Sequence, residues 1–141
     1  MKFLPEKLYK KIVRSVPILC VDLVIKKGSK TLLIKRKLPP RSGYWCLVGG
    51  RVHYNETVMQ AVRRQAKVEL GLKVKVIKFI GVYDNPKRDP SKHSISLAYL
   101  VTPVSGKLRT GPESLGFEYF KKLPARIGYD HRKILNDVGF K

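Results

Sequence analysis

A strand that ends in two glycines, followed by a short loop and a helix, is the feature that most constrains what this chain can form. The apolar run at 44–48 predicts a short buried strand, and Gly49-Gly50 stops it. A helix is expected over 56–70, with Asn55 as its N-cap and Gly71 as its left-handed end. Because glycine has no side chain, the backbone here can approach a ligand or present a carbonyl oxygen to a metal ion.

The helix at 56–70 carries two polar residues on its inner side. Its apolar stripe recurs at every fourth position: Val58, Val62, Ala66 and Leu70. At about 100° per residue, Gln65 and Glu69 fall on the same side as this stripe. A buried carboxylate is costly unless a cation or several donors satisfy it. An ion pair of Glu69 with Arg64 or Arg63 at the domain edge is the structural alternative.

The remaining elements indicate one mixed domain. β-Branched and apolar runs predict strands, and polar or glycine-containing segments separate them. The expected strands are 16–26, 31–34, 73–83, 94–104 and 117–120, with a polar loop at 84–93 and a C-terminal helix near 130–138. Helices among several short strands favour an α/β (α+β) fold with a mixed sheet. A length of 141 residues suits a single domain over 1–141.

Composition narrows the class of protein and its partners. A net charge of +20, from 30 Lys and Arg against 10 Asp and Glu, favours anionic partners such as nucleotides, nucleic acid or acidic lipid surfaces. A general contribution to solubility is the alternative. Cys20 and Cys46 lie in apolar runs and are expected to be buried strand thiols. The N-terminal segment lacks the apolar region of a secretory signal and no run can span a membrane, so a cytoplasmic protein without membrane partners is expected.

The glycine loop and the helix also match a family signature in their spacing. Five residues separate Gly50 from Glu56, and seven separate Glu56 from Arg64. The matching positions are Gly50, Glu56, Arg64, Glu69, Gly71 and Leu72. This pattern resembles the Nudix box, a loop-helix-loop signature of metal-dependent hydrolases. The resemblance implies a Nudix-type α/β/α sandwich with a mixed β-sheet, and hydrolysis of a nucleoside diphosphate-linked substrate with Mg²⁺ or Mn²⁺.

The sequence departs from the box at Gln65 and Val68, where the family usually has glutamates. The GDP-mannose mannosyl hydrolase branch is similar in this respect, because it has lost the same two glutamates and kept the last one. Lys35-Arg36 and the segment 43–52 also resemble that branch. This resemblance favours a nucleotide sugar, GDP-mannose-like, as the substrate.

The resemblance assigns roles to the matching residues. The carbonyl of Gly50 and the carboxylate of Glu69 are implied metal ligands, with oxygen donors that suit a hard divalent cation. Arg64 and Glu56 are implied catalytic-site residues: Arg64 braces the box loop through its salt bridge, and Glu56 ties down the loop on the N-terminal side of the helix.

Arg36 and Arg51 match arginines that contact the diphosphate, a role that suits the bidentate guanidinium group. Glu113 is expected to be a catalytic base or a further metal ligand, because pyrophosphatase branches carry a glutamate in the loop before the last strand. Ser114 cannot replace the histidine base of the mannosyl hydrolase branch. The loop and strand at 84–96 resemble those of ADP-ribose pyrophosphatases.

Two alternatives therefore accompany hydrolysis of a nucleotide sugar. The first is a pyrophosphatase of ADP-ribose or a nucleotide sugar, in which water attacks phosphorus. The second is a Nudix module that binds nucleotide or RNA without catalysis. Nucleic acid is the less favoured partner, because the aromatic residues fall in expected strands or beside the box. A homodimer is left open. His93 is a candidate base or substrate contact, although a lone loop histidine is more often at the surface. His53 in the box loop is a weaker candidate, and His131 is expected in the last helix.

Overall fold

The computed structural model describes residues 4–141 of the chain. Its elements in chain order are α1 (Glu6–Ser15), β1 (Ile18–Lys27), β2 (Lys30–Arg36), β3 (Trp45–Cys46), β4 (Val48–Arg51), α2 (Val58–Leu70), β5 (Leu72–Tyr83), β6 (Ser94–Gly106), β7 (Ser114–Phe120) and α3 (His131–Asp137). Residues 1–3, with which the expected domain and the charged N-terminal segment begin, lie outside the described residues.

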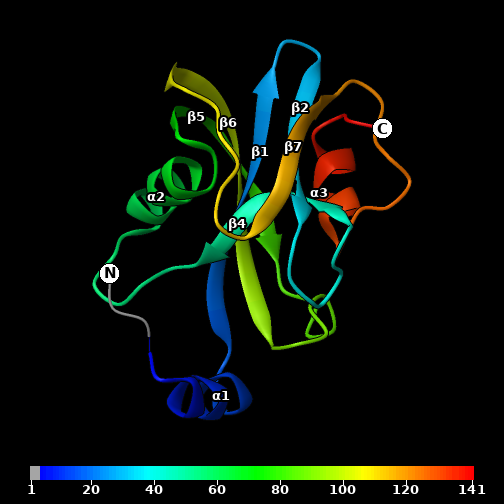
Figure 1. The fold of residues 1–141 in the computed structure, drawn as a ribbon. Helices are drawn as coiled ribbons and strands as arrows, with labels where there is room; N and C mark the ends of the chain where they lie inside the picture. Colours follow the sequence, from blue (N-terminus) through cyan, green and yellow to red (C-terminus); the bar gives the residue numbers. More distant parts are fainter. Residues whose placement is uncertain (1–3) are drawn as a thin grey trace.

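Within residues 4–141, seven strands form one mixed sheet (Figure 1). The main path has the order β3-β2-β1-β6-β5, while β4 pairs with β1 and β7 pairs with β2. Strands β1 and β6 run parallel, from Ile18 opposite Ser94 to Ile25 opposite Val101. The other strand pairs are antiparallel. The expected mixed sheet is therefore confirmed.

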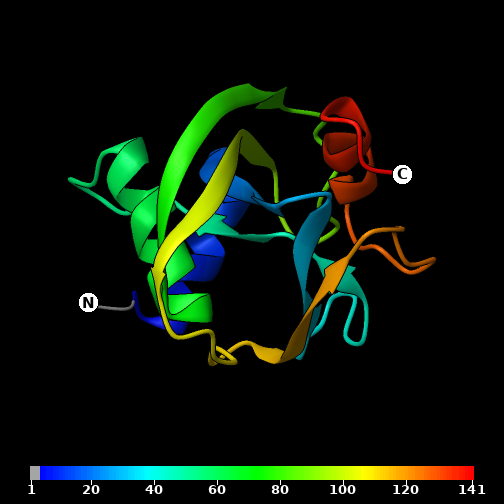
Figure 2. The same ribbon diagram turned by 90° about the horizontal axis from the view of Figure 1, so that it is seen from above.

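Helices α2 and α3 lie on opposite sides of this sheet (Figure 2). One buried cluster joins α2 to the sheet through Val62, Ala66 and Leu70, and a second joins α3 to the other face through Ile134 and Leu135. Strand β1 contributes to both clusters, which explains its continuous apolar run. The three layers confirm the α/β/α sandwich.

Helix α2 begins one residue after Thr57, not directly after Asn55 as expected. The Thr57 hydroxyl accepts a hydrogen bond from the Gln60 backbone, and the Gln60 side chain returns one from the Thr57 backbone. This reciprocal capping box satisfies two amides that Asn55 would leave open. At the other end Gly71 is left-handed, with φ of 70°, as expected.

The interrupted strand at 44–48 is the second departure from the expected elements. It is two short strands, β3 and β4, that separate at Leu47 and pair with different neighbours. Strand β3 pairs with β2, and β4 crosses to pair with β1, so Val48 lies opposite Leu23 and Gly50 lies opposite Val21. The two glycines are thereby inside the sheet rather than beyond its end.

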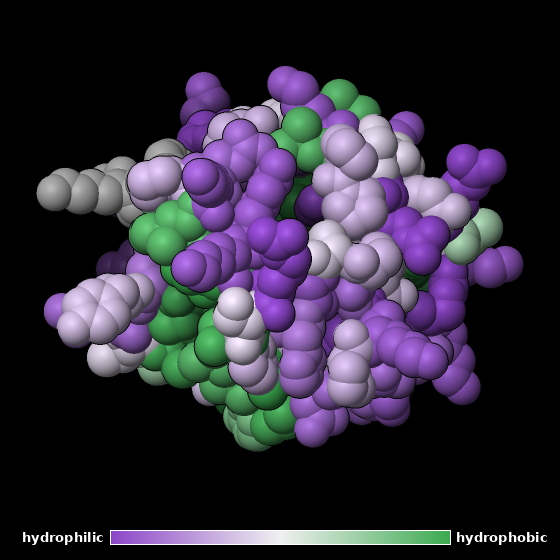
Figure 3. Space-filling view, turned by 90° about the horizontal axis from the view of Figure 1, so that it is seen from below, coloured by the Kyte–Doolittle hydropathy of each residue, from purple (hydrophilic) through white to green (hydrophobic). Residues whose placement is uncertain are grey.

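Helix α1 was not among the expected elements. Its apolar residues Leu8, Tyr9, Ile12 and Val13 share one side at helical spacing, but none of its residues is fully buried. Figure 3 looks onto the end of the molecule where α1 lies, and hydrophilic side chains prevail there beside a hydrophobic region. Among residues 4–141, no helix is long and apolar enough to cross a bilayer.

Candidate active site

Two glycines of β4 form one wall of a cavity because side chains could not fit there. A Cβ atom on Gly49 would overlap the carboxylate of Asp22 and the carbonyl oxygen of Val21. A Cβ atom on Gly50 would overlap the side-chain amide of Gln65. The backbone of β4 is consequently packed directly between β1 and the inner face of α2.

Glu69 projects from α2 into the same cavity and is only 6% exposed. Its Oε2 atom has no hydrogen-bond partner among residues 4–141. Burial raises the pKa of Glu69 above its usual value, the nearby carboxylate of Glu113 adds to this effect, and Arg109 opposes it. A buried carboxylate oxygen without a donor calls for a cation or a water molecule.

Glu113 is brought near Glu69 by a turn that packs on the helix. The backbone of Gly111 lies so close to Glu69 that a Cβ atom there would be 2.7 Å from Oε2. Glu113 follows in this turn, directly before β7, and lines the cavity. Strand β7 is longer than the expected 117–120, but the loop placement of Glu113 is unchanged.

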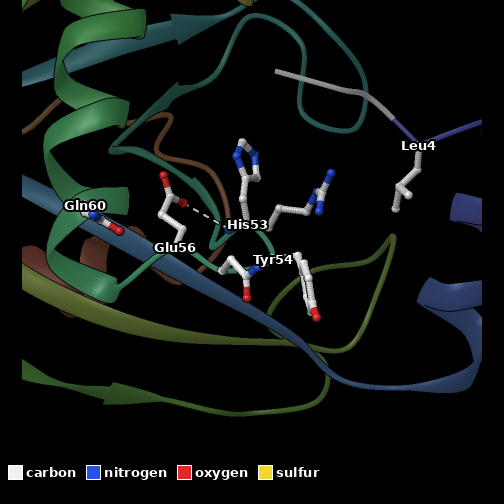
Figure 4. A pocket seen from close by; sticks show the side chains of 7 residues that line it. Leu4, His53, Tyr54, Glu56 and Gln60 are labelled. Atoms are coloured by element: carbon white, nitrogen blue, oxygen red, sulfur yellow. Dashed lines mark hydrogen bonds between the residues drawn. The ribbon is translucent and has the colours of Figure 1, made fainter.

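Glu56 and Arg64 form an ion pair that shapes the loop after β4. The Nε atom of Arg64 lies 2.6 Å from Oε2 of Glu56, and its Nη2 atom donates to Oε1 at 3.0 Å. The hydrogen bond from Arg64 lowers the pKa of Glu56 to about 2, against an opposing effect of burial. Arg64 also donates to the Arg51 carbonyl at 3.0 Å. Glu56 accepts a hydrogen bond from the His53 backbone amide, as Figure 4 shows. Arg64 therefore pairs with Glu56 and not with Glu69.

Residues from several elements enclose a cavity of about 610 Å³. Each of the expected site residues except Glu56 lines it; Glu56 lines an adjoining pocket of about 470 Å³ together with Arg51 and His53 (Figure 4). The larger cavity contains equal numbers of acidic and basic side chains: Glu6, Asp22, Glu69, Asp89 and Glu113 against Arg36, Arg51, Arg64, Arg88 and Lys92. Such a cavity suits a ligand that carries both phosphates and polar groups.

Arg36 is held at the cavity by backbone carbonyl groups. Its Nε atom donates to the Pro40 carbonyl at 2.6 Å and its Nη2 atom to the Pro39 carbonyl at 3.4 Å. The guanidinium group lies 5.6 Å from the centre of the Tyr129 ring. Arg51, the last residue of β4, has its guanidinium group 6.0 Å from the ring centre of Tyr9 in α1.

A buried polar network in the wall of the cavity was not expected from the sequence. Arg88 donates to both carboxylate oxygens of Asp130 at 2.8 and 2.7 Å, to Asp22 at 3.0 Å and to Ser94 at 2.7 Å. Ser96 donates to Asp22 at 2.6 Å. The one available signal was Asp22 itself, a carboxylate in the middle of an apolar strand, where it needs buried partners.

His131 completes this network and connects it to Leu47, the residue between β3 and β4. The Leu47 amide donates to Nδ1 of His131 at 3.0 Å, so the proton of the neutral ring is on Nε2, which lies 3.3 Å from Asp22. Burial raises the pKa of Asp22, but His131 and then Arg88 and Ser96 outweigh this effect, so the pKa is lower than usual. His93 lies outside this network, and its carbonyl group accepts a hydrogen bond from the Ile18 amide at 2.8 Å.

The thiols behave as expected. Cys20 and Cys46 are free and buried, and burial raises their pKa values to about 11 and about 12. Both are thus protonated thiols at neutral pH.

A NUDIX domain model matches residues 16–137 of the chain. The chain belongs to the Nudix family. It is 42% identical over 123 residues to an ADP-ribose pyrophosphatase of Methanocaldococcus jannaschii. The aligned region covers 86% of this chain and 72% of that protein. It is 34% identical over 105 residues to the low-salt glycan biosynthesis protein Agl8 of Haloferax volcanii, covering 70% of this chain and 67% of that protein.

The structural comparison agrees with this membership. The crystal structure of a MutT NUDIX hydrolase from Burkholderia pseudomallei has a TM-score of 0.81 and 29% identity, covering 88% of this chain and 99% of that chain. This Nudix chain is therefore a hydrolase of the family, and Nudix hydrolases generally use divalent metal ions.

The two departures from the Nudix box have different structural consequences. With its amide oriented to suit its neighbours, Gln65 donates to the Gly49 carbonyl at 3.2 Å and accepts from Arg64 at 3.1 Å. Gln65 thus links α2 to β4, because its neutral amide can both donate and accept hydrogen bonds. Val68 is 40% exposed at the cavity rim and adds no charge. Glu69 is the one box carboxylate among these helix positions that remains buried in the cavity.

Proposed function

We propose that this Nudix hydrolase cleaves a nucleoside diphosphate linked to a sugar, with ADP-ribose the favoured substrate and Mg²⁺ or Mn²⁺ as cofactor. The observation that carries the proposal is the buried Oε2 atom of Glu69, which has no partner in residues 4–141 and lies near Glu113. Arg36 and Arg51 line the same cavity and supply positive charge for a diphosphate.

The residues present fit a hard divalent cation. Two carboxylates and a backbone carbonyl are oxygen donors of the kind that Mg²⁺ and Mn²⁺ prefer. Glu69, Glu113 and the carbonyl of Gly50 would hold the ion, and a bound ion would relieve the unfavourable burial of Glu69. When bound, such an ion supplies charge neutralisation at the phosphate oxygens and lowers the pKa of a water molecule.

The protein's own residues would bind and orient the substrate. Arg36 and Arg51 would bind the diphosphate oxygens through charge-assisted hydrogen bonds. Arg64 and Glu56 would keep the box loop in place, because their ion pair joins α2 to the loop at both ends. Glu113 would serve as a metal ligand or accept the proton of the attacking water.

Attack at phosphorus is favoured over attack at the sugar carbon. The position after Glu113 is Ser114, whose hydroxyl group is buried at the start of β7 and cannot act as a histidine base. The similarity to an ADP-ribose pyrophosphatase supports the same choice, and the similarity to Agl8 is compatible with a nucleotide sugar. AMP and ribose 5-phosphate are therefore the expected products from ADP-ribose.

The test is a hydrolysis panel with product identification. ADP-ribose, GDP-mannose and a nucleoside triphosphate are incubated with the protein in ¹⁸O-labelled water, with Mg²⁺ or with EDTA. Metal-dependent formation of AMP and ribose 5-phosphate, with the label in one phosphate, is the expected result. Free sugar plus nucleoside diphosphate would show attack at carbon instead. Binding without turnover of any panel member would favour the non-catalytic module and overturn the proposal.

A further inference from the structure

The guanidinium group of Arg36 is restrained from more than one direction. Arginine has five N–H donors, and the Pro40 and Pro39 carbonyls accept two of those of Arg36. The Cζ atom of Arg36 lies over the Tyr129 ring, 5.6 Å from the ring centre. The remaining N–H groups are in the plane of the guanidinium group, next to the cavity that Arg36 lines.

Tyr129 adopts an uncommon backbone conformation at this point. Its φ is 55°, in the left-handed region that aromatic residues rarely occupy. Such a conformation persists only where the surrounding structure imposes it, and it is commonest at functional positions. Tyr129 also lines the cavity and has its ring 5.1 Å from that of His131.

Backbone hydrogen bonds on both sides impose this conformation. The Trp45 amide donates to the Arg126 carbonyl at 2.9 Å, and the Gly128 amide donates back to Trp45 at 2.8 Å. The His131 amide then bonds to the Gly128 carbonyl at 3.3 Å as α3 begins. The backbone is fixed before and after Tyr129, and this places its ring beside Arg36.

We propose that Tyr129 is a positioning residue that orients Arg36 toward the diphosphate of the substrate. The ring attracts the cation at its face and keeps water from that side, so the free N–H groups stay directed at the cavity. The inference rests on the proposed role of Arg36 in diphosphate binding. It requires the aromatic face of Tyr129 but not its hydroxyl group.

The experiment measures binding of ADP to the metal-free protein by titration calorimetry, so that it does not depend on turnover. The variants are Tyr129→Phe, Tyr129→Leu, Arg36→Ala and the double variant Arg36→Ala with Tyr129→Leu. Tyr119→Leu is the matched control, because Lys27 lies over the Tyr119 ring at the same 5.6 Å but neither residue lines the cavity. Thermal unfolding of each variant reports its folding.

Tyr129→Leu should weaken ADP binding by roughly three- to thirtyfold, the range of a cation–π interaction from exposed to desolvated. Tyr129→Phe should bind within about twofold of the wild type, and Tyr119→Leu should do the same. The double variant should bind no more weakly than Arg36→Ala alone, because the ring acts through Arg36. In the hydrolysis assay, Tyr129→Leu should raise KM more than it lowers kcat.

Additive effects of the two substitutions, or a Tyr129→Leu variant that binds ADP normally, would overturn the positioning role. Equal loss in Tyr129→Phe would assign the effect to the hydroxyl group and would also overturn it. Should Tyr129→Leu fail to fold, Tyr129→Asn replaces it, because asparagine tolerates the left-handed conformation and also lacks the aromatic face. If the two substitutions are coupled in ADP binding as expected but no substrate is hydrolysed, the proposed function is refuted and this inference stands.

Discussion

Replacement of Arg88 by alanine is the sharpest test of the buried network. Arg88 makes four hydrogen bonds, to Asp22, Ser94 and both oxygens of Asp130, and its side chain is only 5% exposed. The substitution removes the guanidinium group and leaves the Asp22 carboxylate buried. Ser96 and His131 remain as partners of Asp22, so the fold should survive in a weakened form.

The magnitude follows from the cost of an uncompensated buried charge. Removal of one partner of a buried ion pair typically costs about 3–5 kcal/mol. For a domain of this size, each kcal/mol corresponds to a change in Tm of roughly 3 °C, so Arg88→Ala should lower Tm by about 10–15 °C. Lys133→Ala is the control, since Lys133 pairs with Asp137 on the surface, and such a change should stay within about 0.5 kcal/mol.

The pH dependence adds a second measurement. Because the pKa of Asp22 is lowered in the folded state, its stabilising contribution is present above its unfolded pKa and is lost as the pH falls through the folded value. The difference between wild type and Arg88→Ala should therefore narrow below about pH 4. Urea unfolding monitored through Trp45 at pH 7 and pH 3.5 measures both effects. A difference under 1 kcal/mol at pH 7 would refute the reasoning.

Three further predictions concern the cavity. Without metal, Glu69→Gln should unfold at a higher temperature than the wild type at pH 7, because a carboxylate with a raised pKa destabilises the fold as the pH rises above the pKa of the unfolded state. Mg²⁺ should raise the Tm of the wild type only. A rise in Tm of the variant with Mg²⁺ would argue against Glu69 as a metal ligand. Glu113→Gln should lower kcat about a hundredfold or more, whereas Glu118→Gln, at an exposed residue of β7, should change kcat little. Equal kcat values for the two variants would contradict the assignment of Glu113. Arg51→Ala should lower kcat/KM by an amount that corresponds to about 1–3 kcal/mol, measured by initial rates, and an unchanged value would make Arg51 a bystander.

Periodicity in the sequence was enough to predict the elements that depend on local pattern. The four-residue stripe of α2 placed Gln65 and Glu69 on the buried side, and both are buried there. Apolar runs predicted most strands, and the glycine at 71 predicted the end of the helix. Helix α1 was missed although it is amphipathic. None of its residues is fully buried, and its many charges make the sequence look like an exposed charged segment.

The long-range parts of the site could not be predicted in this way. Arg88 is 66 residues from Asp22 and 42 from Asp130, and no local pattern records that these side chains meet. The exchange of partners at Leu47 likewise depends on where β1 and β2 lie in the sheet. His131 was assigned to the last helix, which is correct, but its bond to the Leu47 amide depends on the tertiary fold.

The balance of charge inside the cavity has a consequence for how substrates arrive. Taking its five acidic and five basic side chains from the totals of 10 and 30 leaves 5 acidic against 25 basic residues in the rest of the chain. The attraction that an anionic nucleotide feels at a distance therefore comes from the outer surface, whereas the cavity itself is nearly neutral. The rate of substrate binding and the rate of turnover should therefore respond differently to ionic strength. Added salt slows diffusional encounter, because screening shortens the reach of the surface field to about 8 Å at 0.15 M. The turnover of substrate that is already bound should depend little on salt.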